Sequence, residues 1–429
     1  MDKVEFKPSH VIAIDGSCIS VSLKEGYPGA EVGYVTIASV ILKLDLLRKL
    51  DTMRPIDPVQ FRKTEEAESL DAVFPGCNIV VDNEVSARSS FRRTLYELLR
   101  DTRLFEEGES LLETYEVLLA DKPLDTPSKR QSCPYSNMYE DDCDAQEQIY
   151  QRGQGEYGCN CFSSRPLYST DALRIHERMR PDSTNSGIFT ETMQVLERLW
   201  LIHILRGFEK LGYLQLLKSC AFMLDGPLAI FGQPAWLSQS IKKELQRINS
   251  VAHPHTDNHD LLIIGIEKSG TFVSHLEQLA NTKMIEEEAI RDRSFLDIAS
   301  RIRDNSLIYP QMAFLLTDSY IKQNIIYSES VRSYGRQTYF GRKFFYRTKS
   351  GAYIVASLPF LREADDDLTY AEPKQFPRLA DAMALFDQLV SSKYPNSLSP
   401  IVAAHSEAAI PLNLGKKVLE KLARDLMQE

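Results

Sequence analysis

Four short apolar segments constrain the fold of this chain more than any other feature. They read VIAID at 11–15, AFMLD at 221–225, LLIIGI at 261–266 and MAFLLTD at 312–318, and each runs into polar or glycine-containing residues. None shows the strict alternation expected of a strand with one solvated face. Segments of this kind are typical of strands that are covered on both faces of a sheet.

Helical patterns lie between these strands. Apolar residues recur at three- and four-residue spacing in 91–100, 192–208 and 415–427. The segment 34–47, YVTIASVILKLDLL, is predicted to be a strand that runs into a helix. We therefore predict an α/β fold with a mixed sheet flanked by helices. The chain shows no repeat, low-complexity tract or long linker, so we expect a single domain over 1–429.

Composition and charge limit the class of protein. The 429 residues are 43% hydrophobic and 26% charged, as in folded soluble proteins. The net charge of −10 argues against non-specific binding of nucleic acid, but it leaves room for a local basic groove. The first residues lack a signal-peptide core, and Lys43 and Asp45 interrupt the longest apolar segment. We expect a cytoplasmic protein with no membrane segment and with reduced cysteines.

Two aspartates follow predicted strands directly. Asp15 lies in IDGS and Asp225 in LDGP, so each carboxylate precedes a glycine where a turn is expected to end the strand. Ligands of open α/β sheets collect at the carboxyl ends of strands, and two such carboxylates can share a divalent cation. The alternative is that each Asp-Gly pair is only a good turn dipeptide, and the sequence leaves both readings open.

His405 is a candidate third ligand. It follows the apolar run PIVAA, which we predict to be another strand, and it precedes a helix expected to begin near Leu414. A neutral imidazole beside two carboxylates favours Mn²⁺ over Mg²⁺ or Ca²⁺. A lone histidine can equally be a structural residue.

The segment 332–349 is basic and aromatic, and it contains no acidic residue. Its six basic residues are Arg332, Arg336, Arg342, Lys343, Arg347 and Lys349, and its six aromatic residues are Tyr334, Tyr339, Phe340, Phe344, Phe345 and Tyr346. Alternating polar and aromatic residues around glycines predict a β-hairpin extension. Such a hairpin could bind a single nucleic-acid strand by phosphate contacts and base stacking. The alternative is a hairpin whose aromatic side chains belong to the core.

A polar segment at 122–187 is predicted to be an insertion without a hydrophobic core of its own. It holds Cys133, Cys143, Cys159 and Cys161, which could bind a structural zinc ion in place of a core. Their spacing lacks the usual paired knuckles, so free thiols are an equal alternative.

Lys268 follows the LLIIGI strand and precedes a helix, where it could contact a phosphate. The segment is not a P-loop, because no GxxxxGK[ST] occurs in the chain. ATP hydrolysis is therefore unsupported. The absence of GxSxG and HExxH also disfavours esterase and zinc-protease activity.

In combination these segments resemble the NurA family of DNA-processing nucleases. The resemblance rests on IDGS, MQVLERLWLIHILR, FMLDGPLAIFGQPAWLS, LLIIGIEKSGTF, YGRQTYFGRKFFYR and PIVAAHSEAAIPLNLGKKVLEKLA, which span nearly the whole chain in family order. It implies an RNase H-like fold and a deoxyribonuclease dependent on Mn²⁺ or Mg²⁺, which cuts single-stranded DNA and resects DNA ends. It also implies a homodimer that works with a HerA-like hexameric ATPase in DNA repair or anti-phage defence.

The resemblance also implies site residues. The metal ligands would be Asp15, Asp225, His405 and a helix glutamate, for which Glu197 matches best and Glu191 and Glu209 are alternatives. Two metal ions are the usual arrangement for phosphodiester hydrolysis. The predicted DNA-binding residues are Lys268, Arg336, Tyr339, Arg342, Lys343 and Tyr346, and a family tyrosine near the metals would be Tyr339 or Tyr346.

Two rival functions remain open at this stage. One is a NurA-like subunit that no longer cuts DNA and instead regulates or loads a HerA-type ATPase. The other is an RNase H-like hydrolase that acts on RNA.

Overall fold

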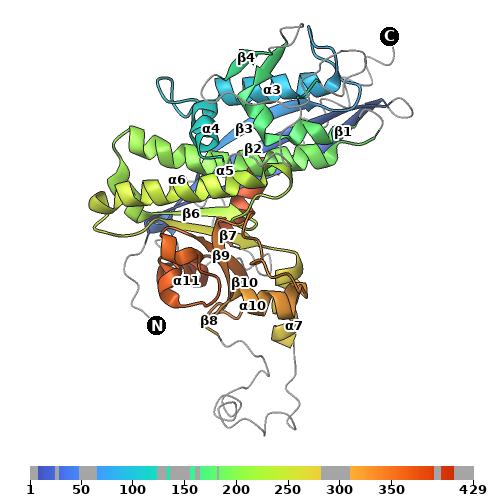
Figure 1. The fold of residues 1–429 in the computed structure, drawn as a ribbon. Helices are drawn as coiled ribbons and strands as arrows, with labels where there is room; N and C mark the ends of the chain where they lie inside the picture. Colours follow the sequence, from blue (N-terminus) through green and yellow to red (C-terminus); the bar gives the residue numbers. More distant parts are fainter. Residues whose placement is uncertain are drawn as a thin grey trace.

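One mixed sheet organises the molecule (Figure 1). The structure, a computed structural model, describes residues 8–24, 29–47, 65–122, 133–135, 155–159, 165–180, 183–281, 310–390 and 398–409. Within these ranges, eight strands lie in the order β3-β2-β1-β6-β7-β10-β9-β8. Their bounds are β1 His10–Lys24, β2 Ala30–Lys43, β3 Glu65–Pro75, β6 Cys220–Asp225, β7 Leu262–Glu267, β8 Met312–Leu315, β9 Gly341–Arg347 and β10 Tyr353–Pro359.

The sheet contains both antiparallel and parallel strand pairs. β1, β2 and β3 form an antiparallel meander, whereas β6 lies parallel to β1 and β7 lies parallel to β6. β10, β9 and β8 continue the sheet with antiparallel pairs. The predicted mixed α/β sheet is therefore confirmed.

Helices cover both faces of the sheet (Figure 1). On β1, Ile12 and Ile14 pack into a core cluster with the helices that precede or follow β6, whereas Val11 and Ala13 pack into a second cluster on the other face. Both faces are apolar, which explains why the strands lack alternation. The helices are α1 Leu44–Leu47, α3 Ala87–Asp101, α4 Leu111–Ala120, α5 Ser186–Lys210, α6 Leu237–Ala252, α7 Thr271–Asn281, α10 Asp318–Ile321 and α11 Leu379–Leu389, with a further helix at 399–409.

The predicted turn at Asp15–Gly16 is wrong. β1 continues through both residues to Lys24, and Gly16 pairs with Ile37 of β2. A two-residue hairpin turn of the favoured types needs a positive φ, and Gly16 is not among the glycines that have one. Uninterrupted pairing with β2 keeps this Asp-Gly extended. The expectation does hold at Gly226, whose φ of +81° forms a turn directly after β6 ends at Asp225.

The predicted hairpin extension is also only half right. β9 and β10 form a hairpin, but they lie inside the main sheet between β7 and β8. Phe344, Phe345 and Tyr346 are therefore core side chains. The sheet gains two inner strands here and no projecting arm.

His405 does not follow a strand. The run PIVAA belongs to the helix at 399–409, and Ile401, Ala404 and Ala408 are its fully buried face. A short apolar run cannot distinguish a strand from a buried helix by periodicity, which is why the prediction failed. The helix predicted at 415–427 lies outside the described residues.

Two short strands, β4 Glu156–Gly158 and β5 Pro166–Tyr168, form a separate small sheet in the segment 122–187. Later residues of this segment, such as Leu173 and Ile175, pack into the main core. Among the described residues, no helix is long and apolar enough to cross a membrane.

Candidate metal centre and active site

Asp15 and Asp225 lie side by side on neighbouring parallel strands. The register of β1 and β6 pairs Ile14 with Leu224, and the two aspartates come next on each strand. The side chain of Asp15 is 2% exposed and that of Asp225 is 27% exposed. Burial raises the pKa of Asp225, and the nearby Asp15 carboxylate raises it further. The free energy of this arrangement would fall if a cation bound between the carboxylates.

His405 reaches the two aspartates from the helix at 399–409. Its Nδ1 lies 2.9 Å from Oδ2 of Asp15, and this hydrogen bond raises the pKa of His405. One candidate ligand atom from each of Asp15, Asp225 and His405 lies within 4.8 Å of the others. Two carboxylates and an imidazole at this spacing fit a divalent transition metal ion.

Glu197 approaches the same place from the opposite face of the sheet. Asp15 projects toward the helix at 399–409, so the next residue, Gly16, faces α5. A Cβ atom at position 16 would lie 2.5 Å from Oε1 of Glu197, and therefore only glycine leaves room for this carboxylate. The importance of Gly16 is the space that it leaves rather than a turn.

The two alternative glutamates lie elsewhere. Glu191 pairs with Arg178 and accepts a hydrogen bond from the backbone N–H of Gln233. Glu209 pairs with Arg247 at the other end of α5. Neither lines the pocket that contains Asp15, Asp225 and Glu197.

Arg198 is a buried site residue that sequence reasoning missed. Its guanidinium forms an ion pair with Glu197, and its Nη2 donates to the carbonyl oxygens of Asp225, at 3.2 Å, and Pro227, at 3.1 Å. Burial lowers the pKa of Arg198 to about 10 although Asp225 and Asp15 favour its charge. Arg198 thus ties α5 to the turn after β6. Its position directly after Glu197 was the only available signal.

A pocket of ≈ 760 Å³ is lined by the site residues, which are Asp15, Glu197, Arg198, Asp225 and His405. Lys268, just after β7, places Nζ 3.1 Å from Oδ2 of Asp225, and its side chain is 30% exposed. Glu267, which the sequence analysis did not identify as a site residue, lines the pocket and forms an ion pair with Lys343. Glu267 is the last residue of β7, as Asp225 is the last residue of β6. An acidic residue at the end of a predicted buried strand could therefore have identified it from the sequence.

Three of the predicted DNA-binding side chains have internal partners. Arg342 donates to the carbonyl oxygens of Asp365, Asp367 and Tyr370. The Tyr346 hydroxyl donates to Asp387, and the Lys343 ammonium pairs with Glu267. All three side chains are buried because β9 is an inner strand, although Arg342 and Lys343 line a second pocket together with Arg336 and Tyr339. Their contact with DNA stays a prediction.

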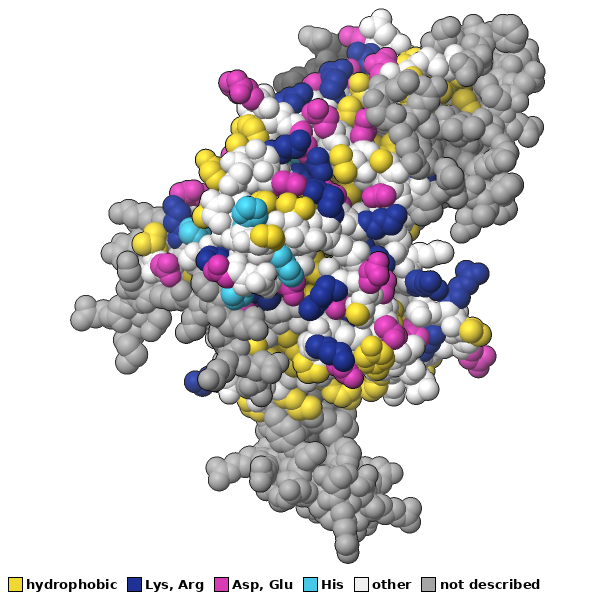
Figure 2. All heavy atoms as spheres, turned by 60° about the vertical axis from the view of Figure 1, so that its left-hand side comes forward, with side chains coloured by type: hydrophobic (Ala, Val, Ile, Leu, Met, Phe, Trp, Pro, Cys, Tyr) yellow, Lys and Arg dark blue, Asp and Glu magenta, His cyan; other side chains and the backbone are white. Residues whose placement is uncertain are grey.

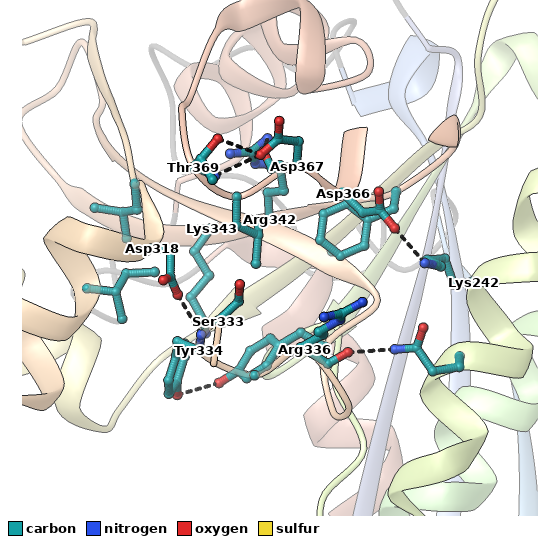
Figure 3. Close-up of a pocket in the computed structure, with 18 residues that line it drawn as sticks. Lys242, Asp318, Ser333, Tyr334, Arg336, Arg342, Lys343, Asp366, Asp367 and Thr369 are labelled. Carbon is teal, nitrogen blue, oxygen red and sulfur yellow. Dashed lines mark hydrogen bonds and ion pairs between the residues drawn. The ribbon is translucent and has the colours of Figure 1, made fainter. Parts of the chain in front are cut away.

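Arg336 and Tyr339 line a second, smaller pocket of ≈ 280 Å³, shown in Figure 3. Arg336 is exposed, whereas the Tyr339 hydroxyl lies 3.0 Å from that of Tyr334 within the protein. Of the six predicted DNA-binding residues, Lys268 and Arg336 therefore have accessible charged ends. The face shown in Figure 2 mixes basic and acidic side chains, without a broad basic area.

The cysteines of the segment 122–187 are only partly described. Cys133 is buried in a small cluster with Tyr135 and Leu167, and Cys159 packs against this cluster. Cys143 and Cys161 lie outside the described residues, so the zinc site stays a prediction.

Comparison with known proteins places the chain in a family. The model of the NurA domain matches residues 9–410. A similar solved structure is the crystal structure of the NurA nuclease from Sulfolobus solfataricus, at 11% identity and a TM-score of 0.32, covering 99% of this chain and 88% of that one. No curated protein matches the chain. Because the NurA domain model extends over nearly the whole sequence, this chain belongs to the NurA family of nuclease domains.

Proposed function

We propose that this chain is a metal-dependent deoxyribonuclease that cuts single-stranded DNA and DNA ends. The observation that carries the proposal is the convergence of Asp15, Asp225 and His405 in a NurA domain. Glu197 is proposed as the fourth metal-binding residue because it lines the same pocket. The proposed cofactor is Mn²⁺, with Mg²⁺ as the alternative.

The fold is proposed to be RNase H-like. The strand order β3-β2-β1-β6-β7, with β2 antiparallel to both of its neighbours and β1, β6 and β7 parallel, supports this assignment. In such sheets the carboxyl ends of the parallel strands collect ligands. Asp225 ends β6 and Lys268 follows β7, and Asp15 lies beside Asp225 where the pairing of β1 with β6 ends.

Each side chain has a distinct part in the proposed reaction. Divalent ions bound at the carboxylates would activate water and stabilise the leaving oxygen. Asp15 and Asp225 supply the negative charge that binds them, and the His405–Asp15 hydrogen bond orients both side chains. The Lys268 ammonium is close enough to the site to bind a phosphate oxygen. Arg198 holds the backbone that carries Asp225 in position.

The test is cleavage of a labelled single-stranded oligonucleotide by the wild type, Asp225→Asn and Asp15→Asn in Mn²⁺. We expect each substitution to reduce the cleavage rate at least about 100-fold. Loss of a residue that hydrogen-bonds to a metal ligand already costs about 10- to 100-fold, and loss of the metal ligand itself should cost more. Asp101→Asn is the control, since its carboxylate pairs with Arg100 on the surface. Full activity of either site variant would refute the assignment.

The partners are proposed from the family alone: a second copy of this chain, and a HerA-like hexameric ATPase that delivers DNA during repair or anti-phage defence. Co-purification with such an ATPase and a sedimentation measurement test both. A wild type that binds DNA and stimulates the ATPase without cleaving DNA, even when the ATPase is present, would show that the chain is instead a regulatory subunit. Parallel assays on RNA test the remaining alternative.

A further inference from the structure

Phe231 is an exposed aromatic side chain in a pocket otherwise lined mainly by charged, polar and small residues. It is the only phenyl, phenol or indole ring among the described residues that line the pocket of Asp15, Asp225 and His405. The residue is 40% exposed. Leaving a phenyl ring in water forgoes the free energy gained by burial. An exposed ring beside a reaction centre therefore needs an explanation.

The backbone that carries Phe231 is fixed. After the Gly226 turn, Ala229 pairs with Tyr339 in an isolated bridge. The N–H of Ile230 donates to the carbonyl of Thr338 at 2.9 Å, and Leu228 and Ile230 are fully buried. After the ring, the N–H of Gln233 donates to Glu191 at 2.9 Å. Phe231 thus projects from a segment that is held on both sides of it.

The ring itself is supported on one side. Its centroid lies 5.7 Å from that of Tyr339, with an edge-to-face angle of 81°. Tyr339 is held in turn by the hydroxyl of Tyr334 and by the Lys343 ammonium, which lies 4.7 Å from its ring centroid. Figure 3 shows Tyr334 and Lys343 among the residues that line the neighbouring pocket. Tyr339 therefore fixes the orientation of Phe231 and leaves the rest of its surface to the pocket.

We propose that Phe231 is a stacking platform for the nucleobase next to the phosphate held at the metal centre. The inference rests on the proposed function and specifies its substrate. A base in a duplex already stacks on its neighbours and presents only its edges, whereas an unpaired base can offer a whole face. Phe231 thereby selects single strands, while Lys268 on the same pocket binds the backbone.

The test is binding of a cleavage-resistant phosphorothioate single-stranded oligonucleotide in Mn²⁺, measured by fluorescence anisotropy, so that the metal centre can hold the phosphate and cleavage plays no part. Base–aromatic stacking corresponds to about 5- to 150-fold in affinity, and we expect a loss of this size in Phe231→Leu. Leucine keeps the apolar contact with Tyr339 but has no π face. Phe231→Trp should retain wild-type affinity. An oligonucleotide with 2-aminopurine at each position in turn should show quenching at one position in the wild type and not in Phe231→Leu.

Tyr370→Ala is the matched control, because Tyr370 is also 40% exposed and lies outside the pocket. It should bind the oligonucleotide as the wild type does. Thermal unfolding of each variant shows that the fold is retained.

Equal affinity of wild type and Phe231→Leu overturns the stacking role, even if the wild type cleaves DNA. Weakened binding in Phe231→Leu with no wild-type cleavage supports the stacking role and refutes the nuclease. The two proposals can thus fail separately.

Discussion

Two groups of charged side chains in this molecule differ in how their charges are compensated: the pair of Arg92 with Asp171 is balanced, and the pair of Asp15 with Asp225 is not. Arg92 and Asp171, both 1% exposed, form a two-pronged ion pair with nitrogen–oxygen distances of 2.7 Å. Burial alone would raise the pKa of Asp171, but the charge and hydrogen bonds of Arg92 outweigh burial and lower it. At Asp225 burial and a second carboxylate act in the same direction, and the pKa rises.

The difference separates a structural site from a binding site. Both regions lose hydration when the chain folds, at a cost in free energy. At Arg92 the protein offsets that cost internally and links α3 to the segment that follows β5. At Asp15 and Asp225 the charge of the buried Arg198 offsets part of that cost. The side chains of Lys268 and His405 beside them are partly exposed, so an ion that binds from solution can offset the rest.

The largest expected effect tests the balanced pair. Arg92→Met removes the guanidinium that neutralises the buried Asp171 carboxylate and should lower the free energy of unfolding by about 3–5 kcal/mol. Urea titration at neutral pH measures this. Arg93→Met on the same helix is the control, since its partially exposed pair with Glu97 should contribute about 0.5 kcal/mol or less. A small effect of Arg92→Met would mean that the pair is not a structural element.

The next effect tests the unbalanced pair. Mn²⁺ at about 100 times its dissociation constant should stabilise the wild type by about 2.7 kcal/mol, because it binds only the folded state. Asp225→Asn should lose this stabilisation while being as stable as the wild type in EDTA, since it removes a like-charge repulsion. Thermal unfolding with and without Mn²⁺ measures both. A destabilised Asp225→Asn in EDTA would show that the carboxylates are balanced after all.

The smallest effect, counted for one residue and one pH unit, concerns two buried histidines: His176, which lies beside Asp171, and His203 on α5. Burial lowers the pKa of His176 to about 3 and that of His203 to about 4, so both are neutral in the folded state. A histidine whose folded pKa is depressed stabilises the fold above its unfolded pKa of about 6.5 and loses that contribution as pH falls toward the folded pKa. Each should therefore reduce stability by up to about 1.4 kcal/mol per pH unit below pH 6.5.

Urea titrations between pH 7 and pH 5 measure this slope. His203→Gln removes one of the two titrations and should make the slope shallower. An unchanged slope in that variant would show that His203 does not contribute.

Much of the fold could be predicted because its signals are local. The buried strands 11–15, 221–225 and 261–266 and the long helix α5 are evident from apolar composition and periodicity. Asp225 at a strand end with a glycine turn was equally readable. These features depend on residues that are near one another in the chain.

The errors arose where distant segments decide. Pairing with β2 keeps Asp15–Gly16 extended, and the space that Gly16 leaves is filled by Glu197 from α5. The position of β9 between β10 and β8 buries Arg342 and Tyr346, and local composition did not decide this burial. His405 lies on a helix because its apolar neighbours pack against the sheet.

The sequence by itself determined which residue types are present for chemistry and which segments are buried, because both follow from side-chain composition and spacing. Only the tertiary structure decided which of these residues meet. Asp15, Asp225 and His405 are brought together by parallel pairing of β1 with β6 and by a helix almost 400 positions from Asp15. Arg198 and Phe231 acquire their positions in the same way. A pocket is made by contacts across the sheet, and no local pattern records them.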